Sequence, residues 1–453
     1  MIAAPSLRDR VLLALKTVGT IALLEAALPV SLAVTAVALV RSRVSPLPQG
    51  SESSERSEDV TSSAKTVLLS GGKMTKSLQL ARSFHAAGHR VIMVESAKYR
   101  LSAHRFSRSV DAFYTVPDAP SPQYSSALID IVRREGVDVY VPVCSPVASR
   151  YDALAKPALE EWCEVVHGNI DMVDRVDDKA AFAAAAADLG LPVPDTHRVT
   201  DAAEVGDFDF ADHQGPYVLK SIPYDPVNRL DLTRLPRPTS QQTLSFASTK
   251  PIDEATPWIL QSFIAGQEYC THGTARDGHL QVWACCESSA SQLNYRMVDK
   301  PEIKSWVTKF VGELGLTGQY SFDFIERADG QVFAIECNPR THSAITMFYD
   351  HPGLARAYLE TGGAAITPTA TSRPTYWIAH ELWRMIRAPR TAQQSWTVIK
   401  EGKDAVFDWS DPWPFFMLHH VHIPSLLLGN LLRLRPWTKI DFNIGKLVEP
   451  GGD

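Results

Sequence analysis

The chain has 453 residues, of which 45% are apolar and 21% are charged. This length accommodates two or three domains, and the composition is that of an ordinary globular protein. With 45 basic and 51 acidic residues the formal net charge is −6, so the charge balance gives no reason to expect nucleic acid as a partner. The six cysteines show no C-x-x-C pair and no zinc spacing, which favours a reduced, cytoplasmic setting.

The first 45 residues contain an apolar segment. Between Thr17 and Val40 the only charged residue is Glu25, and basic residues flank the segment on both sides. A helix over this range would be ~36 Å long, enough to cross a hydrocarbon core of ~30 Å. A helix packed on the body of the protein is the alternative, because Glu25 and Pro29 interrupt the apolar run. The segment therefore predicts either a membrane anchor or a packed helix, and its two basic flanks select no orientation.

Residues 46–64 contain mainly Pro, Ser and Glu without an apolar period, which predicts a flexible linker. Strands and helices then alternate over residues 65–165. The first strand is expected at Thr66–Ser70 and the first helix at about Thr75–Ala87, and similar pairs follow. This β-α-β order predicts a small doubly wound parallel sheet.

A glycine pair separates that first strand from its helix. The Gly71-Gly72-Lys73 turn matches neither G-x-G-x-x-G nor a Walker phosphate loop, so it is a weak nucleotide signal. Ligands do collect at the carboxyl ends of parallel strands. We therefore expect Gly71, Gly72, Lys73 and Lys76 to contact a substrate.

A second region spans residues 166–364. Asp178 is placed to cap a helix over Lys179–Leu189, and strands are expected at Tyr217–Lys220 and Trp258–Ile264. Residues 365–453 are rich in aromatic side chains and have poor periodicity, which predicts an appendage that packs on the body. Within it, the apolar run Ile423–Leu432 is expected to be either buried core or a second membrane-facing element.

The most informative stretch is the hairpin before residue 340. An Asp-Gly pair at 329–330 is a strong signal for a two-residue hairpin loop. With that loop, Asp323 lies directly opposite Glu336, and Ser321 lies opposite Asn338. Since side chains alternate along a strand, the acidic residues and the amide share one face.

Two carboxylates that face each other across a hairpin repel unless a cation lies between them. Oxygen ligands from Asp323, Glu336 and Asn338 suit Mg²⁺, which usually binds one or two carboxylates together with substrate phosphates. The alternative is an ordinary surface hairpin with two solvated acids. The metal site is the better interpretation because Glu336 ends an apolar strand, and it indicates that the chain handles a nucleotide triphosphate.

These residues resemble those of ATP-grasp enzymes in type and order. A closer resemblance is to the mycosporine-glycine synthetase family of ATP-grasp ligases, which acts in mycosporine-like amino acid biosynthesis. It is carried by four motifs: Lys16-Thr-Val-Gly-Thr, Gly71-Gly-Lys-Met-Thr-Lys, Glu336-Cys-Asn-Pro-Arg-Thr-His-Ser and Asp411-Pro-Trp-Pro-Phe-Phe. The resemblance covers nearly the whole chain except the linker, and it implies an α/β ATP-grasp fold preceded by the small parallel-sheet domain.

The resemblance also implies roles for individual residues. Lys179 and Lys220 would hold the phosphates of ATP, with Lys220 also acting in catalysis. Gln261, Phe263 and Ile264 would form the strand against adenine, and Glu268 would bind the ribose. Asp323, Glu336 and Asn338 would bind Mg²⁺, and Arg340 would steady the transferred phosphoryl group, as suits phosphoryl transfer.

Two further residues are assigned less sharply. His342 is expected to contact substrate or to be structural, and Arg296 to contact phosphate or to pair with Asp299. The sequence departs from many ATP-grasp enzymes after Lys220, where Ser-Ile-Pro-Tyr-Asp-Pro-Val-Asn-Arg contains no glycine and so no glycine-rich flap over the phosphates.

The implied reaction joins glycine to 4-deoxygadusol, a cyclohexenone, with ATP and Mg²⁺ as cofactors. The alternatives are a carboxylate–amine ligase that forms an acyl phosphate, and a membrane-tethered ATP-binding protein without turnover. The partners are thus small molecules, an amino acid and a cyclohexenone, with no nucleic acid. ATP chemistry requires the body of the protein to be cytoplasmic, whether or not residues 17–40 attach it to a membrane.

Overall fold

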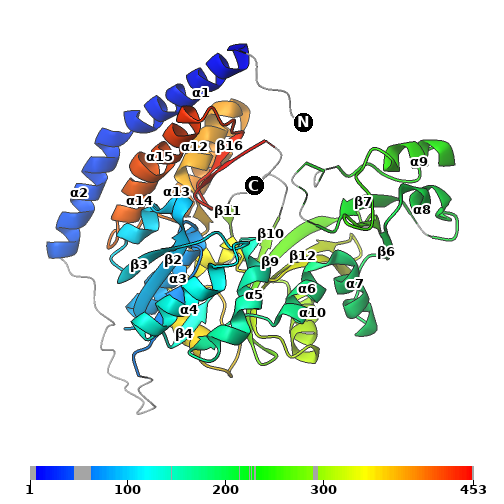
Figure 1. Ribbon diagram of the computed structural model, residues 1–453, viewed down its shortest axis with the longest axis horizontal. Helices are drawn as coiled ribbons and strands as arrows, with labels where there is room; N and C mark the ends of the chain where they lie inside the picture. The colour runs from blue at the N-terminus through cyan, green and yellow to red at the C-terminus, as the bar shows by residue number, and fades with distance from the viewer. Residues whose placement is uncertain are drawn as a thin grey trace.

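The computed structural model describes residues 7–44, 63–143, 145–213, 215–223, 225, 227–228, 231–288 and 294–450. Most of the expected linker at 46–64 lies outside the described residues. The elements form a parallel-sheet domain, a larger region with two antiparallel sheets, and a set of C-terminal helices beside the N-terminal helices (Figure 1).

The first domain is built as the β-α-β pattern predicts. Its five strands pair in parallel in the order β3-β2-β1-β4-β5. The apolar strands β1 and β2 are buried on both faces, as expected for a sheet covered by helices on its two sides. The strands are Thr66–Leu69 (β1), Arg90–Ser96 (β2), Ala112–Val116 (β3), Val139–Val141 (β4) and Glu164–Val165 (β5), and the helices are Thr75–Ala86 (α3), Tyr124–Glu135 (α4) and Ala148–Leu159 (α5).

The larger region holds two antiparallel sheets, of order β6-β8-β7 and β10-β9-β12-β13. Aromatic residues of the helix Pro301–Glu313 (α10) pack with β12 on one face of the four-stranded sheet, which leaves the opposite face of β12 and β13 to the polar residues. The strands are Thr196–Val199 (β6), Tyr217–Ser221 (β7), Trp258–Ser262 (β8), Gln267–Arg276 (β9), His279–Glu287 (β10), Gly318–Glu326 (β12) and Val332–Asn338 (β13), and the further helices are Ile170–Asp177 (α6), Lys179–Asp188 (α7), Ala202–Asp207 (α8), Ser240–Ala247 (α9) and Leu354–Leu359 (α11).

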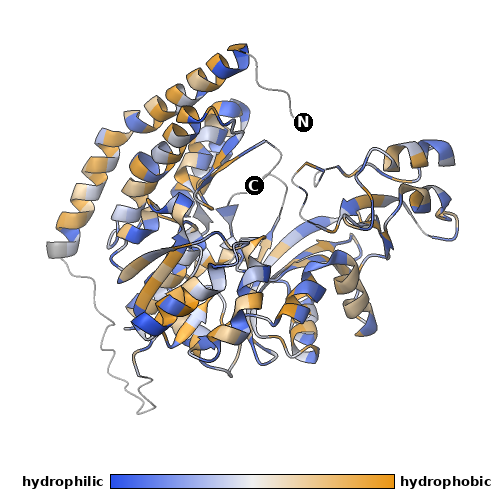
Figure 2. Cartoon of the chain, viewed as in Figure 1, coloured by the Kyte–Doolittle hydropathy of each residue, from blue (hydrophilic) through white to orange (hydrophobic). Residues whose placement is uncertain are grey.

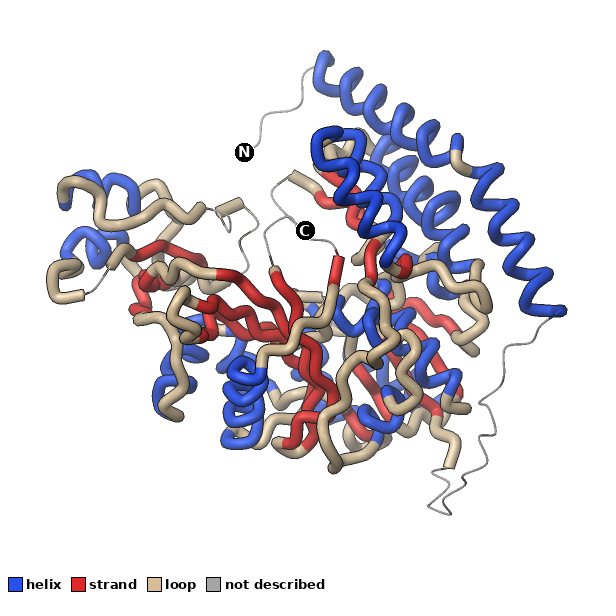
Figure 3. Tube along the Cα trace, turned by 180° about the vertical axis from the view of Figure 1, so that it is seen from behind, coloured by secondary structure: helices blue, strands red, loops and turns tan. Residues whose placement is uncertain are grey.

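The C-terminal residues pack on the first domain and beside the N-terminal helices (Figures 1 and 3). Asp411 is buried and accepts hydrogen bonds from Arg82 Nε at 3.0 Å and from Ser107 Oγ at 2.6 Å, both in the first domain. The elements are Ile378–Arg387 (α12), Ala392–Glu401 (α13), Trp413–Met417 (α14), Ile423–Leu432 (α15), the short strands Asn294–Tyr295 (β11), Thr375–Tyr376 (β14) and Lys403–Asp404 (β15), which pair together, and the hairpin Lys439–Asp441 (β16) and Lys446–Val448 (β17).

The N-terminal segment forms two consecutive helices, Leu7–Ala26 (α1) and Leu28–Val44 (α2), separated by a turn at Ala27. They lie along the outside of the C-terminal helices (Figure 1). Within the part of the chain that the structure describes, two helical segments are long and apolar enough to cross a membrane, Leu7–Ser42 and Trp413–Leu432. Residues of the apolar run Ile423–Leu432 differ in burial. Ile423 and Leu427 are core residues, whereas Leu428 and Leu432 are exposed.

Candidate active site

Two carboxylates and an amide meet on the hairpin of β12 and β13. Asp323 is paired with Glu336, and Ser321 is paired with Asn338, as the sequence predicts. The neighbouring Phe322 and Cys337 point into the core on the other face of the sheet. The polar side chains therefore share one face, next to a cavity of about 320 Å³.

The predicted two-residue loop is wrong. Arg327 N donates to Gln331 O at 2.9 Å, so three residues form the loop and Gly330 adopts a left-handed φ of 83°. This loop shifts the strand pairing by one residue, and an irregularity between Ala334 and Glu336 shifts it back. The extra residue at this bulge is Ile335, which moves Glu336 to the face opposite Ala334. The predicted pairing is right because these two departures cancel.

The two carboxylates share negative charge in a confined space. Burial, and then the neighbouring Glu336 carboxylate, raise the pKa of Asp323 well above its usual range. Burial also acts to raise the pKa of Glu336, but the Lys179 ammonium and a hydrogen bond from Asp323 outweigh it and lower that pKa. Without a cation, ionisation of both carboxylates at once is therefore unfavourable. A divalent cation would relieve this repulsion, so the donor set fits Mg²⁺.

Cations surround the same carboxylates. Lys179 Nζ lies 3.6 Å from Glu336 Oε2, at the start of α7, where Asp178 caps the helix by accepting from two backbone N–H groups. Asn338 Nδ2 donates to Glu336 Oε1 at 3.3 Å, and Arg340 donates to Asn338 Oδ1. These contacts orient the amide and the carboxylate toward one point.

Lys220 is placed by a residue that was expected to contact adenine. Its Nζ donates to Gln261 Oε1 at 2.9 Å, and Gln261 Nε2 donates to Thr196 Oγ1 at 3.2 Å. Burial lowers the pKa of Lys220, and the nearby Glu336 carboxylate partly opposes this. The side chain of Gln261 thus supports the lysine and is itself buried, and its contact with adenine stays a prediction.

The other residues that were expected to bind the nucleotide follow β8. The predicted strand extended to Ile264, but β8 ends at Ser262, so Phe263 and Ile264 lie in the connection to β9. Phe263 N donates to Pro216 O at 2.7 Å, and its ring lies under the Arg234 guanidinium. Glu268 is exposed near the start of β9 and belongs to the charges that act on Lys220. Phe263 and Ile264 therefore lie on the connection after β8, and Glu268 lies at the exposed start of β9.

The first domain contributes one lysine to the cavity. Lys76, in the first turn of α3, is buried and its Nζ donates to the backbone carbonyl of Thr341 at 2.6 Å. It lines the same cavity as Asp323, Glu336 and Arg340. The cavity therefore lies between the parallel-sheet domain and the antiparallel hairpin.

The other residues of the glycine turn have packing roles. A Cβ on Gly71 would lie 2.2 Å from the carbonyl oxygen of Val143, and one on Gly72 would meet the Phe113 ring at 2.9 Å. Lys73 is paired with Glu95 at 3.1 Å. None of these three residues lines the cavity, in contrast to Lys76.

Arg296 and His342, which the sequence assigned less sharply, lie in different places in the structure. Arg296 is 65% exposed and pairs with Glu401 at 3.0 Å and not with Asp299; it does not line the cavity, and its contact with phosphate stays a prediction. His342 lines the cavity, and its Nδ1 accepts from Ala344 N at 3.2 Å, which fixes the ring at the start of a short helix over Ser343–Phe348.

Several residues at the site were not expected. Asp177 approaches Arg340 at 3.9 Å, and Thr341 and Ser343 line the cavity. Asn443, from the far C-terminus, donates to Ser343 Oγ at 2.7 Å. Asp177 could have been found from the sequence, because it stands two residues before Lys179. No local pattern connects Asn443 with Ser343.

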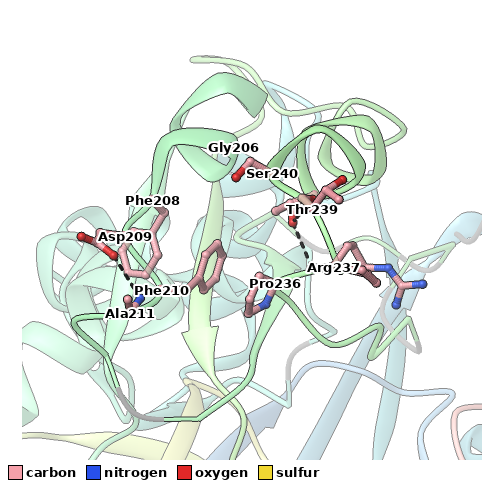
Figure 4. A pocket seen from close by; sticks show the side chains of 11 residues that line it. Gly206, Phe208, Asp209, Phe210, Ala211, Pro236, Arg237, Thr239 and Ser240 are labelled. Carbon is pink, nitrogen blue, oxygen red and sulfur yellow. Dashed lines mark hydrogen bonds between the residues drawn. The ribbon is translucent and has the colours of Figure 1, made fainter.

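A second cavity, of about 430 Å³, lies apart from these residues between Phe208–Ala211 and Pro236–Thr243 (Figure 4). Phe208 and Phe210 form one wall, and Arg237 and Thr239 lie on the other. None of the site residues expected from the sequence lines it, so the hairpin cavity is the candidate active site.

Solved structures share this architecture. An N5-carboxyaminoimidazole ribonucleotide synthetase solved with ADP has a TM-score of 0.52 and 16% identity, over 69% of this chain and 80% of that chain. The Staphylococcus aureus N5-carboxyaminoimidazole synthetase, also with ADP, has a TM-score of 0.50 and 14% identity, over 68% and 80%. The biotin carboxylase domain of Hydrogenobacter thermophilus 2-oxoglutarate carboxylase has a TM-score of 0.49 and 14% identity, over 62% of this chain and 65% of that chain.

The chain has the ATP-grasp fold, which confirms the fold expected from the sequence. It spans about two thirds of the length of the biotin carboxylase domain. No family model and no curated protein matches the sequence.

Proposed function

We propose that the protein is an ATP-dependent, ADP-forming ligase that makes a carbon–nitrogen bond. The observation that carries the proposal is the cavity lined by Asp323, Glu336, Asn338 and Arg340 in an ATP-grasp fold, with two further cations, Lys179 and Lys220, near the Glu336 carboxylate. This is the charge arrangement that phosphoryl transfer requires, because positioning and neutralisation of phosphate supply most of the rate.

Each group has a role in the proposed mechanism. Asp323, Glu336 and Asn338 would hold Mg²⁺, which when bound supplies charge neutralisation for the phosphates. Lys179 and Lys220 hold the phosphates from the α7 side and the β7 side of the site. Arg340, fixed by Asn338 and Asp177, reaches the transferred phosphoryl group with a planar guanidinium that can donate two parallel hydrogen bonds.

We assign the acceptor substrate to the same cavity. Lys76, Ser343 and His342 line it together with the carboxylates. The acceptor oxygen would then face the phosphoryl group held by Arg340. Enclosure by two domains places the reactants together and removes the entropic cost of their encounter.

The substrate pair we propose is 4-deoxygadusol and glycine, giving mycosporine-glycine. Support for this choice comes from the four motifs that resemble the mycosporine-glycine synthetase family. ATP phosphorylates the enol oxygen of the cyclohexenone, the glycine amine attacks the activated carbon, the carbon–oxygen bond breaks, and phosphate leaves while the amine loses a proton. The phosphate replaces hydroxide, which is a poor leaving group.

The second candidate is a carboxylate–amine ligase that acts through an acyl phosphate. It is favoured by the fold similarity to synthetases whose names indicate carboxylation chemistry. The same residues would serve either reaction. A protein that binds ATP without turnover is the remaining candidate, and it predicts ATP binding with no ADP release.

The test is ADP release by the full-length protein with MgATP, 4-deoxygadusol and glycine, with each component omitted in turn and the product identified by mass. ADP that requires all three, together with the mass of mycosporine-glycine, supports the full proposal. ADP with a carboxylic acid and an amine overturns the substrate and keeps the ligase. No ADP with any pair overturns the ligase.

A further inference from the structure

The inward face of the N-terminal helices is mixed. Its fully buried side chains are Thr17, Thr35 and Ala38, and Leu13, Ile21 and Leu24 pack beside them against the core. On the outer face, Leu23 is 57% exposed and Val30 is 68% exposed. A helix on the surface of a water-soluble protein instead exposes polar residues and keeps its apolar stripe toward the core.

Polar contacts hold the inward face to the C-terminal region. Lys16 Nζ donates to Trp437 O at 2.7 Å and lies 3.7 Å from the centre of that indole ring. Trp437 Nε1 donates to Thr17 Oγ1 at 3.0 Å, and Glu25 pairs with His420 at 3.4 Å. Three polar residues of the segment, Lys16, Thr17 and Glu25, therefore contact the C-terminal region.

Between the charged residues near its two ends the outward face is mostly apolar, and in Figure 2 orange predominates along α1 and α2. From Val11 to Val40, every exposed residue other than Lys16 is a leucine, valine, alanine, glycine or proline. Monomeric soluble proteins rarely expose a continuous apolar strip of this size. The strip therefore suits a partner that offers no hydrogen bonds.

The neighbouring C-terminal helices widen this strip. The helix α15 packs beside α1 and exposes Leu428 at 50% and Leu432 at 76%. Near the other end, Arg41 lies 5.5 Å from the ring of Trp409, which is 45% exposed. Tryptophan and arginine side chains of this kind lie at the boundary between lipid chains and headgroups.

A simple membrane span does not fit the geometry. The helical segment Leu7–Ser42 has 36 residues, which corresponds to ~54 Å against a hydrocarbon core of ~30 Å. Its contacts with the protein body occur at Lys16 and Thr17, where the apolar run begins, and at Glu25 within it. A span would have to place these contacts, and the residues of the C-terminal region that make them, inside the bilayer.

Basic residues lie at both ends of the strip. Arg8, Arg10 and Arg41 are exposed on α1 and α2, and Arg433 and Arg435 are exposed just after α15. A second copy of the chain packed on the strip in either direction would bring these like charges together. A membrane that contains anionic lipids complements them, because a helix in the membrane plane presents both of its ends to the same leaflet.

We propose that the face formed by α1, α2 and α15 is a monotopic membrane-binding surface, with the helices in the plane of an anionic lipid leaflet. The apolar strip enters the boundary between headgroups and acyl chains, and the arginines contact the headgroups. The body of the protein then stands on one side of the membrane. This proposal rests on the helices alone and is independent of the reaction catalysed.

The first test is flotation of the purified full-length protein with vesicles of phosphatidylcholine alone or with added phosphatidylglycerol. We expect binding to the anionic vesicles, and a loss of about tenfold or more for Leu23→Glu, which places a charge on the outer face. The matched control is Leu154→Glu, because Leu154 is 48% exposed on α5, outside the strip. Circular dichroism and thermal unfolding check that both variants fold.

A failure of the wild-type protein to bind either vesicle, with a dimer in light scattering, would overturn the proposal in favour of a second copy. Equal loss for Leu154→Glu and Leu23→Glu would also overturn it. Binding that is the same with and without phosphatidylglycerol would overturn the part assigned to the arginines, which Arg8→Gln and Arg10→Gln test directly.

The second test separates an in-plane helix from a span. The variant proteins Arg8→Cys and Arg41→Cys are bound to the outside of sealed vesicles and treated with a membrane-impermeant maleimide. The native cysteines that the structure describes are buried and so are shielded from the reagent. Labelling of both positions supports the in-plane arrangement. Protection of one end only overturns it and indicates a span.

Discussion

Asp323 and Glu336 face each other across β12 and β13 because the bulge at Ile335 restores the register that the three-residue loop displaces. Without the bulge, Glu336 would join Ala334 on the core face, and the site would lose one of its carboxylates. The irregularity is therefore part of the candidate metal site, as is common for bulges beside active sites.

Replacing Glu336 tests the metal assignment. In Glu336→Gln the loss of one ligand charge should lower ADP formation by about 100-fold or more, since charge stabilisation is the main contribution to such chemistry. The fold should be retained, because Gln can still accept from Asn338. Steady-state ADP release measures the effect, with Glu313→Gln on the exposed surface of α10 as the control. Near-normal turnover by Glu336→Gln would remove the carboxylate from the mechanism.

The raised pKa of Asp323 predicts a dependence of stability on pH. Since the folded state holds a proton that the unfolded chain releases, the stability of the metal-free protein should fall as pH rises from about 4 toward the folded pKa. Asp323→Asn removes this loss, so the metal-free variant should be the more stable of the two at neutral pH. Glu336, whose pKa is lowered, stays ionised in both.

Calorimetry with EDTA and with Mg²⁺ over a range of pH measures this behaviour. Mg²⁺ should stabilise the wild-type protein, more strongly at higher pH, and should have little effect on Asp323→Asn. Parallel pH profiles for the two metal-free proteins would contradict the assignment of the shared proton to this pair.

Gln261 should act through Lys220. Gln261→Leu removes the hydrogen bond that orients the ammonium, and the KM for ATP should rise about tenfold, a typical effect for a residue that supports a binding group. Gln261→Glu keeps an acceptor for Lys220 and should restore most of the affinity. If the two variants show the same KM, the role of Gln261 is packing alone.

Two glycines with positive φ should respond differently to alanine. Gly330 has φ 83° and open space around it, so Gly330→Ala should cost only the backbone strain, about 1–2 kcal/mol. Gly71 has φ 67° and lies against the Val143 carbonyl, so Gly71→Ala should cost about 3 kcal/mol or more. Denaturant unfolding measures both, and equal costs would show that contact with Val143 is unimportant.

The sequence predicted the local elements well, because their signals are local. Asp178 caps the helix that carries Lys179, and the strand–turn–helix at Thr66–Ala86 follows from apolar runs and a glycine turn. The opposition of Asp323 and Glu336 was also predicted, although by a loop of the wrong length. Spacing alone did not reveal the bulge, since no residue type marks Ile335 as unpaired.

By itself the sequence determined which residues carry charge and apolar surface, and in what order along the chain. Only the tertiary structure decided that Lys76 of the first domain reaches the hairpin cavity, that Gln261 holds Lys220, and that Arg296 lies elsewhere with Glu401. It also decided that Thr17 and Thr35 of the N-terminal helices face inward while Leu23 and Val30 face outward. The physical reason is that these contacts join residues far apart in the chain, where packing and charge act through space and leave no local pattern.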